Sequence, residues 1–107
     1  MSWQYLTDTE GWKSILEESH VKIQVVLKHS TRCSISSLAK SRLEKQMSSE
    51  DAFYLLDLLQ YRSVSNIIAA DLGVTHESPQ VLIIKNGQCI YHASHSEIAY
   101  DEVIKKL

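Results

Sequence analysis

The sequence predicts an α/β protein in which a central mixed sheet is flanked by helices, with the element order βαβαβαββα. Two observations carry this prediction. Short apolar runs rich in β-branched residues alternate with segments of helical periodicity over the first two thirds of the chain. Beyond them, the dipeptide Asn86-Gly87 separates two more apolar runs, and Asn-Gly is the strongest short-range signal for a β-hairpin. Strands joined through helices are expected to pair in parallel by right-handed crossovers, whereas the last two strands form an antiparallel hairpin.

The N-terminal segment predicts a short edge strand followed by an amphipathic helix. Residues 3–6 are apolar enough for the strand. Thr7 or Asp8 then supplies an N-cap for a helix that extends to about Glu18. The buried face of this helix is marked, at spacings i, i+3 and i+4, by Trp12, Ile15 and Leu16.

The next segment predicts a buried strand that runs through a polar turn into a helix. Residues 21–28 form the strand, because their apolar run is short and β-branched. Ser30 and Thr31 are candidate caps for a helix over about residues 34–47, which contains good helix formers and neither Pro nor Gly. Cys33 lies where this helix is expected to begin.

A third strand and a third helix follow a polar turn at residues 47–51. Residues 52–59 are a second apolar run, which we interpret as a strand. Ser63 or Ser65 is expected to cap the next helix, and Gly73 is expected to end it in the left-handed conformation. The buried side of this helix is provided by Ile67, Ile68, Ala70 and Leu72.

The C-terminal part predicts the hairpin and a last helix. A loop leads to the only proline, Pro79, and residues 81–84 then form an apolar strand. Residues 88–93 return as its partner after the Asn-Gly turn. Residues 97–107 have the spacing of a terminal amphipathic helix.

The composition is that of an ordinary globular protein. The 107 residues, of which 44% are hydrophobic and 22% charged, suit one domain, residues 1–107, with a single core. A formal net charge of −2 gives no electrostatic signature of nucleic-acid or anionic-membrane binding. No apolar run approaches the ~20 residues of a transmembrane helix, and the N-terminus lacks the pattern of a signal peptide. We therefore expect a cytoplasmic protein.

The candidate reactive atom is the sulfur of Cys33. A thiol in the first turn of a helix faces unpaired backbone N–H groups and the positive end of the helix dipole, and both favour the nucleophilic thiolate. Arg32 adds a positive charge beside it. The surrounding residues are polar, which argues against the alternative of an inert buried cysteine.

Two segments carry a resemblance to a known family. They are KHSTRCSIS at residues 28–36 and LGVTHESPQV at residues 72–81, with Ser94-His95 as a further likeness. Together they resemble the YtxJ-like monothiol bacilliredoxins of the thioredoxin-like superfamily, in which Lys-His-Ser precedes the motif Cys-Pro-Ile-Ser. The element order, with a cysteine after the second strand and a lone proline before the hairpin, is likewise the thioredoxin arrangement. One departure is Ser34, which stands where the family usually has Pro and restores an N–H that is able to bond the thiolate.

The resemblance implies a thiol-disulfide oxidoreductase that removes bacillithiol from S-bacillithiolated proteins through a mixed disulfide with Cys33. Bacillithiol is a cysteinyl-glucosaminyl-malate thiol that some bacteria use in place of glutathione. It would be a co-substrate, and the expected partners are bacillithiolated proteins and a partner reductase, without nucleic acid or membrane. We expect no bound metal, nucleotide or flavin cofactor.

Two positions near Cys33 support single-sulfur chemistry. Ser36 stands where a dithiol enzyme would carry its second cysteine, so it cannot resolve a mixed disulfide. Its hydroxyl either donates to the Cys33 thiolate or is merely a polar first-turn group. The resemblance also implies a cis Ser78–Pro79 bond beside Cys33, which would leave the Ser78 backbone free to pair with an incoming peptide.

Several basic side chains are candidate ligand contacts. Lys28, Arg32 and His29 could attract the malate carboxylates, since carboxylate recognition favours cations. Alternatively, Lys28 and Arg32 only keep the turn solvated. His29 is also a candidate neighbour of the sulfur that titrates near neutrality. His76 and His95 lie on loops expected at the active-site end of the fold, so either could touch the ligand.

The remaining alternatives concern Cys89, metals and the class of protein. Cys89 is expected near the hairpin tip, roughly 15 Å or more from the active-site end, as a core cysteine; a resolving cysteine is the alternative. The five histidines show no metal-ligand spacing, so no metal site is expected. Two rival functions remain open: a non-catalytic thioredoxin-like redox sensor or binding module, and a monothiol-glutaredoxin-like iron–sulfur carrier.

Overall fold

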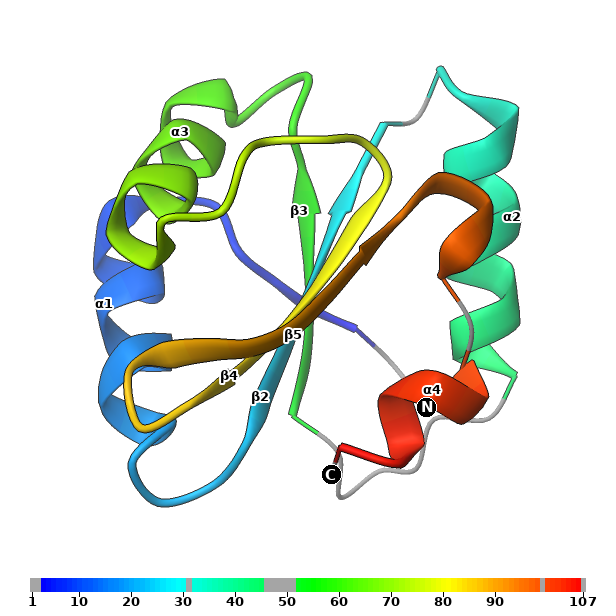
Figure 1. Ribbon diagram of the computed structural model, residues 1–107. Coiled ribbons are helices and arrows are strands. Elements are labelled where there is room, and N and C mark those ends of the chain that lie inside the picture. The colour runs from blue at the N-terminus through cyan, green and yellow to red at the C-terminus, as the bar shows by residue number, and fades with distance from the viewer. Residues whose placement is uncertain (1–2, 31, 46–51, 99, 107) are drawn as a thin grey trace.

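A five-stranded sheet lies between two layers of helices in the computed structural model, which describes residues 3–30, 32–45, 52–98 and 100–106. Helices α1 and α3 cover one face of the sheet, and α2 and α4 cover the other (Figure 1). The strands are β1 (Gln4–Tyr5), β2 (Gln24–His29), β3 (Phe53–Asp57), β4 (Gln80–Lys85) and β5 (Gln88–Ser94). The helices are α1 (Thr9–Glu18), α2 (Ser34–Glu44), α3 (Arg62–Leu72) and α4 (Tyr100–Ile104), with a short 3-10 helix η1 at His95–Glu97. The predicted fold class and element order are confirmed.

The strand order β1-β3-β2-β4-β5 combines a parallel half with an antiparallel half. β1, β3 and β2 pair in parallel, and β4 runs antiparallel to both β2 and β5. The carboxyl ends of β2 and β3 therefore lie at the same edge as the amino end of β4. His29 is the partner of Asp57 at this edge, and Lys28 is the partner of Gln80.

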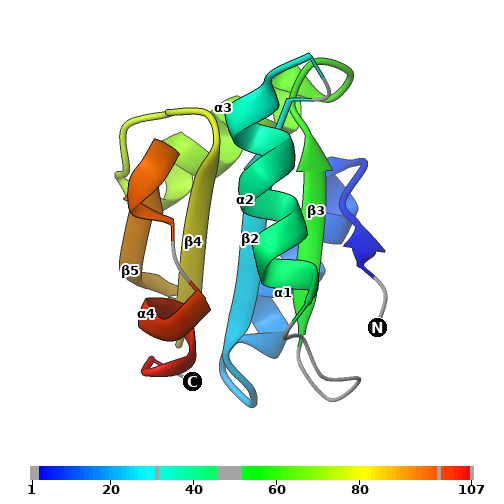
Figure 2. The same cartoon turned by 90° about the vertical axis from the view of Figure 1, so that its right-hand side faces the viewer.

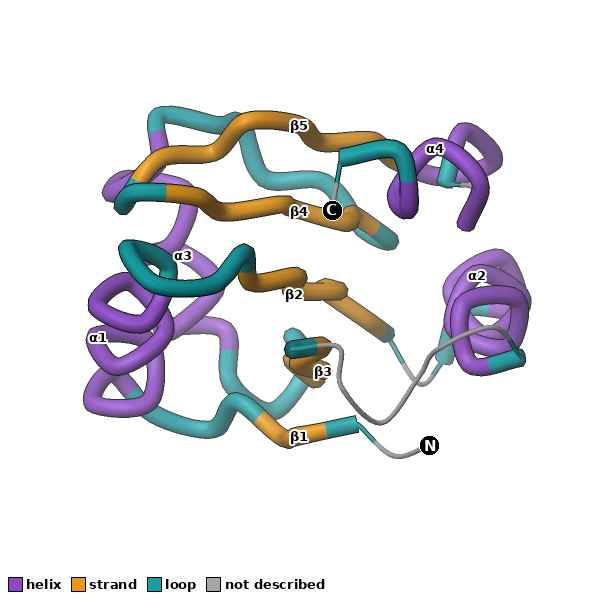
Figure 3. The backbone as a smooth tube through the Cα atoms, turned by 90° about the horizontal axis from the view of Figure 1, so that it is seen from below, coloured by secondary structure: helices purple, strands orange, loops and turns teal. Residues whose placement is uncertain are grey.

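Two hydrophobic clusters form the core, one on each face of the sheet. Every residue of β2 is buried, and its side chains alternate between the clusters. Val25 and Leu27 pack on the side of α2, whereas Val26 packs on the side of α1 and α3. Figure 2 shows α2 lying along the strands that it covers, and Figure 3 shows the two helix layers end-on. By the same alternation, Lys28 and His29 belong to opposite faces.

Three local signals in the sequence have the expected structure. The Asp8 side chain caps α1 by accepting the Gly11 N–H at 2.7 Å. Gly73 ends α3 with φ +67°, the left-handed region that glycine tolerates. Asn86 and Gly87 both have positive φ, +53° and +73°, as a tight hairpin turn requires.

Several element boundaries differ from the predicted ones. β2 begins at Gln24 rather than residue 21, because the amides of Val21 and Lys22 donate to the Glu18 carbonyl and continue the turn after α1. α3 begins at Arg62, before the predicted Ser63 or Ser65 cap, because the amide of Tyr61 closes a turn on the carbonyl of Asp57. The terminal segment contains η1 and the short α4 rather than one helix from residue 97.

The start of α2 is also different from the prediction. Its N-cap is Cys33 itself, and Ser30 is not the cap because its hydroxyl accepts the Arg32 N–H at 3.4 Å. α2 ends at Glu44, and the predicted polar turn at residues 47–51 and the candidate cap Thr31 lie outside the described residues. Within the described ranges, no helix has the length and apolar character needed to cross a membrane.

Candidate active site

Cys33 lies at the junction between β2 and α2. Its amide donates to the Ser30 carbonyl at 3.2 Å, which closes a tight turn, and its own carbonyl accepts the Ser37 N–H of α2. The Cys33 side chain is half-buried, and no capping hydrogen bond to it is found in the described part of the chain. Arg32 and Ser34 flank it as exposed residues. Stabilisation of the Cys33 thiolate by the helix start thus stays a prediction.

A cis peptide bond joins Ser78 to Pro79 at the start of β4. Pro79 is buried and Ser78 half-buried. Gln80, the next residue, is the cross-strand partner of Lys28, which places the proline loop at the same sheet edge as the Cys33 turn. The Pro79 carbonyl accepts the amide of His95 at 3.0 Å, so η1 is tied to this loop as well.

The sequence predicted that Lys28 contacts the ligand or keeps the turn solvated, and the structure supports neither role. It is fully buried, because the alternation of β2 directs it beneath α3. Its Nζ donates to the Ser65 carbonyl at 3.2 Å and lies 3.2 Å from His76 Nδ1. Burial, aided by the charge of Arg62, lowers the pKa of the Lys28 ammonium to about 8. Lys28 therefore holds the loop that leads to Pro79 rather than a ligand carboxylate.

His76 and Gln80 complete this buried polar cluster. His76 Nδ1 also lies 3.0 Å from the Ser65 hydroxyl, and burial followed by the charge of Lys28 lowers the pKa of His76. The Gln80 amide nitrogen donates to the Thr75 carbonyl at 3.0 Å, while its buried oxygen has no hydrogen-bond partner among the described residues. We call Lys28, Ser65, His76 and Gln80 the lysine cluster. Sequence reasoning missed Ser65 and Gln80, although the alternation of β2 and β4 places Lys28 and Gln80 on one face.

His29 forms a second buried polar group on the opposite face. Its Nδ1 lies 2.7 Å from the hydroxyl oxygen of Ser36, and the same oxygen accepts the Ser30 N–H at 2.9 Å. Burial, then the charge of Lys40, lowers the pKa of His29. The predicted bond from Ser36 to the Cys33 thiolate is not formed in the structure, because the hydroxyl is occupied by His29 and Ser30. The hydrogen bonds that Ser36 makes with His29 and Ser30 fix the turn that carries Cys33.

His95 and α2 border a narrow apolar groove beside the Cys33 turn. His95 is exposed and has φ +55°. The groove, of about 180 Å³, is lined by Ile35, Leu38, Ala39, Arg42, His95 and Ile98. The side chains of Ile35 and Leu38 are half exposed, at 50% and 51%.

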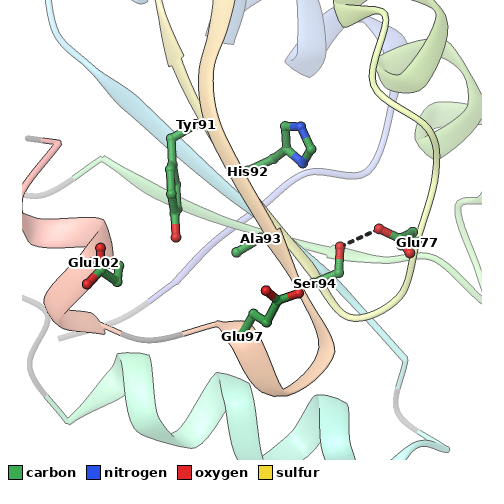
Figure 4. Close-up of a pocket in the computed structure, with 7 residues that line it drawn as sticks. All are labelled: Glu77, Tyr91, His92, Ala93, Ser94, Glu97 and Glu102. Atoms are coloured by element: carbon green, nitrogen blue, oxygen red, sulfur yellow. Dashed lines mark hydrogen bonds between the residues drawn. The ribbon is translucent and has the colours of Figure 1, made fainter.

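A pocket of about 540 Å³ along β5 has a different character. It is acidic, with the carboxylates of Glu77, Glu97 and Glu102, and the Ser94 hydroxyl donates to Glu77 at 2.7 Å (Figure 4). The pocket wall is completed by Tyr91, His92 and Ala93. Such a surface repels anionic ligands.

Cys89 lies at the other end of the sheet from Cys33. It pairs with Ile84 next to the hairpin turn, and Ile84 in turn pairs with Gln24, the first residue of β2. Cys33 follows the last residue of β2, so the two thiols are separated by roughly the 17 Å length of that strand. The Cys89 thiol is half-buried, donates to the Tyr91 carbonyl at 3.3 Å, and has its pKa raised by burial. No group of three metal-ligating side chains is found in the described ranges.

The backbone is similar to several solved structures over nearly its whole length. A proposed oxidoreductase with a thioredoxin fold superposes with a TM-score of 0.86 at 29% identity, covering 95% of this chain and 90% of that one. The thioredoxin Mala s 13 of Malassezia sympodialis gives 0.74 at 16% identity, covering 98% and 87%. Mitochondrial thioredoxin 3 of Saccharomyces cerevisiae, in its oxidized form, gives 0.76 at 18% identity, covering 98% and 95%. At the two lower identities the likeness concerns the fold alone.

The fold, with a cysteine at the start of α2 and a cis-proline at the neighbouring strand, is that of a thioredoxin-like thiol-disulfide oxidoreductase. The family described as monothiol bacilliredoxin BrxC matches residues 4–103. The chain belongs to the monothiol bacilliredoxin family, as the two signature segments predicted.

Proposed function

We propose that this protein removes bacillithiol from S-bacillithiolated proteins through exchange at the single sulfur of Cys33. The observation that carries the proposal is the occupant of the position three residues after Cys33. Ser36 is fully buried there, and its hydroxyl is held by His29 and Ser30. A dithiol enzyme needs a second thiol at this position, so the site supports transfer of an adduct rather than formation of an internal disulfide.

The first half-reaction would load the adduct onto Cys33. The Cys33 thiolate attacks the bacillithiol sulfur of the mixed disulfide on the substrate protein. The disulfide bond between the bacillithiol sulfur and the protein sulfur breaks, the protein thiolate leaves, and a Cys33–bacillithiol disulfide forms. The Ser78 backbone beside cis-Pro79 is the candidate partner for the substrate backbone in this step.

The second half-reaction would regenerate the enzyme. The thiolate of a free bacillithiol attacks the bacillithiol sulfur bound to Cys33, which releases bacillithiol disulfide and the Cys33 thiolate. A partner reductase would then return bacillithiol disulfide to two thiols. A cytoplasmic location is part of the proposal, because this cycle depends on a reduced thiol pool.

The test follows the adduct by intact mass. A bacillithiolated test protein is mixed with the wild-type chain, Cys33→Ser and Cys89→Ser. Transfer onto the wild type and Cys89→Ser, but not onto Cys33→Ser, is expected. An adduct on Cys33→Ser, or no transfer to any form, would overturn the proposal. An internal Cys33–Cys89 disulfide after treatment with bacillithiol disulfide would replace the single-sulfur scheme with a resolving one.

A further inference from the structure

A third hollow, at the carboxyl ends of β1 and β3, lies on the opposite side of the Cys33 turn from the cis-proline loop. We call it the edge pocket. Its volume is about 440 Å³, within the range of roughly 300–1,000 Å³ typical of small-molecule sites. It is lined by Tyr5, Thr7, His29, Lys40, Leu55, Asp57, Gln60 and Tyr61.

The edge pocket combines aromatic rings with hydrogen-bonding groups of several kinds. Tyr5, on the edge strand β1, is 73% exposed and so presents its aromatic ring to a ligand. Tyr61 supplies a second ring. Asp57, Gln60 and Thr7 add a carboxylate, an amide and a hydroxyl to the lining. Aromatic faces with convergent polar groups suit a flat, hydroxyl-rich ring such as a sugar.

Lys40 adds a cationic end to this pocket. Its Nζ donates to Glu44 at 2.8 Å, and an ammonium group carries three N–H donors, so further donors are available to a ligand carboxylate. Lys40 and His29 both line this pocket, and the charge of Lys40 is the second cause, after burial, that lowers the pKa of His29. The pocket thus offers a sugar-binding part and an anion-binding part side by side.

His29 connects the edge pocket to the Cys33 turn. His29 is one of the lining residues, and its Nδ1 lies 2.7 Å from the hydroxyl oxygen of Ser36 in the first turn of α2. The Ser30–Cys33 turn keeps its terminal Cα atoms within about 7 Å, so the Cα atoms of His29 and Cys33 lie within about 11 Å. A cysteinyl-glucosaminyl-malate chain, comparable to three extended residues, spans roughly 10 Å. A ligand bound through Cys33 can therefore reach the wall of the edge pocket that His29 forms.

Two further hollows near the active site fit this ligand less well. The pocket along β5 presents Glu77, Glu97 and Glu102, which repel a dicarboxylate. The groove between α2 and η1 holds about 180 Å³, too little for a sugar with a diacid. Among these three hollows, the edge pocket alone combines a volume in the small-molecule range with an ammonium group, that of Lys40, which the carboxylates of Asp57 and Glu44 balance.

We infer that the edge pocket binds the glucosaminyl-malate part of bacillithiol, with the sugar against Tyr5 and Tyr61 and a malate carboxylate on Lys40. The inference rests on the proposed function, because it assigns the pocket to the adduct carried by Cys33. It makes the exchange selective for bacillithiol over thiols that lack the sugar and the diacid.

The test compares two disulfides by the rate at which each loads Cys33, followed by intact mass. One is bacillithiol disulfide and the other is bis(2-hydroxyethyl) disulfide, which lacks sugar and diacid. In Tyr5→Ala and Lys40→Gln, the ratio of the two rates is expected to fall about tenfold from its wild-type value. The matched control is Lys45→Gln, an exposed lysine just beyond α2, which should keep the wild-type ratio. Melting temperatures of all variants confirm that the fold persists.

A third disulfide, built from cysteinyl-glucosamine without malate, separates the two parts of the pocket. Lys40→Gln should not change the loading rate of this disulfide relative to the hydroxyethyl compound, whereas Tyr5→Ala should still lower it. Unchanged ratios in both variants, or equal losses for all disulfides, would overturn the inference while leaving Cys33 exchange intact. A wild-type chain that reacts with hydroxyethyl disulfide but not with bacillithiol disulfide would instead refute the proposed function, and the inference with it.

Discussion

Lys28 and His29 are neighbours at the end of β2, yet they support opposite halves of the active site. Lys28 turns toward α3, where its hydrogen bonds hold the loop that leads to Pro79. His29 turns toward α2, where it bonds Ser36 and steadies the turn that carries Cys33. Because successive residues of a strand point to opposite faces, these two neighbours each hold one of the two loops that approach the reacting sulfur.

The two anchors differ in charge. The His29 group is a neutral hydrogen-bond network, since burial lowers the pKa of the imidazole. The lysine cluster contains an ammonium that no carboxylate pairs with in the described ranges, and its Gln80 oxygen lacks a partner. An unpaired buried charge is costly, and burial accordingly lowers the pKa of Lys28 to about 8. The proline half of the site should therefore be sensitive to truncation and to alkaline pH, to which the neutral imidazole of His29 does not respond.

The largest effect is expected from Lys28→Ala. This change leaves a cavity beneath α3 and removes two hydrogen bonds from the loop, so we expect the free energy of unfolding to fall by about 3 kcal/mol or more. Urea unfolding measures the loss. Faster hydrogen exchange at the amide of His95, which donates to the Pro79 carbonyl, would show that the loop has loosened. A loss below about 1 kcal/mol would contradict the anchoring role.

Lys28→Met separates the charge from the packing. A lysine whose pKa is lowered from 10.5 to about 8 binds fewer protons folded than unfolded between these values. The free energy of unfolding of the wild type should therefore rise with pH between about 8 and 10.5, by as much as about 3 kcal/mol. Below pH 8, Lys28 is protonated in both states and should cause no change with pH. The Met variant, similar in volume, should lose that rise. Urea unfolding at several pH values compares the two, and parallel curves would refute the assignment.

The sequence was sufficient to predict the fold because local and global signals agree. Asp8, Gly73 and the Asn86-Gly87 turn each have the structure that their residue types favour. The boundaries of the helices and strands were less predictable, because they depend on backbone hydrogen bonds that the sequence pattern does not reveal. β2 begins late because the amides of residues 21 and 22 are used by the turn after α1.

The candidate site was predictable only in part. The position of Cys33 at the start of a helix and the cis bond before Pro79 could be expected, one from local pattern and one from family resemblance. The surroundings of Lys28 could not be expected from its charge, since a lysine is normally exposed and this one is fully buried. Its partner Ser65 comes from a helix almost forty residues away, a contact that only tertiary packing creates.

Ser36→Ala tests the cysteine half. It leaves His29 Nδ1 and the Ser30 amide without their buried partner, so we expect a loss of about 1–3 kcal/mol in the free energy of unfolding. The loss should be smaller than that of Lys28→Ala, because only one oxygen is removed. Ser37→Ala, at the adjacent exposed position of α2, is the matched control. Equal losses in the two serine variants would show that the hydroxyl of Ser36 has no special role.

The smallest effect concerns the imidazole of the lysine cluster. The pKa of His76 is lowered, first by burial and then by Lys28, so the folded state binds fewer protons than the unfolded state below pH 6.5. The stability that this neutral imidazole contributes is complete above pH 6.5. It is lost as the pH falls through the pKa that His76 has in the folded state. His76→Gln should reduce the difference in stability between pH 7 and pH 5 by no more than about 1 kcal/mol, measured by urea unfolding. His92→Gln, at an exposed position of β5, is the control. If the His92 variant loses as much pH dependence as the His76 variant, the acid sensitivity does not belong to the proline half of the site.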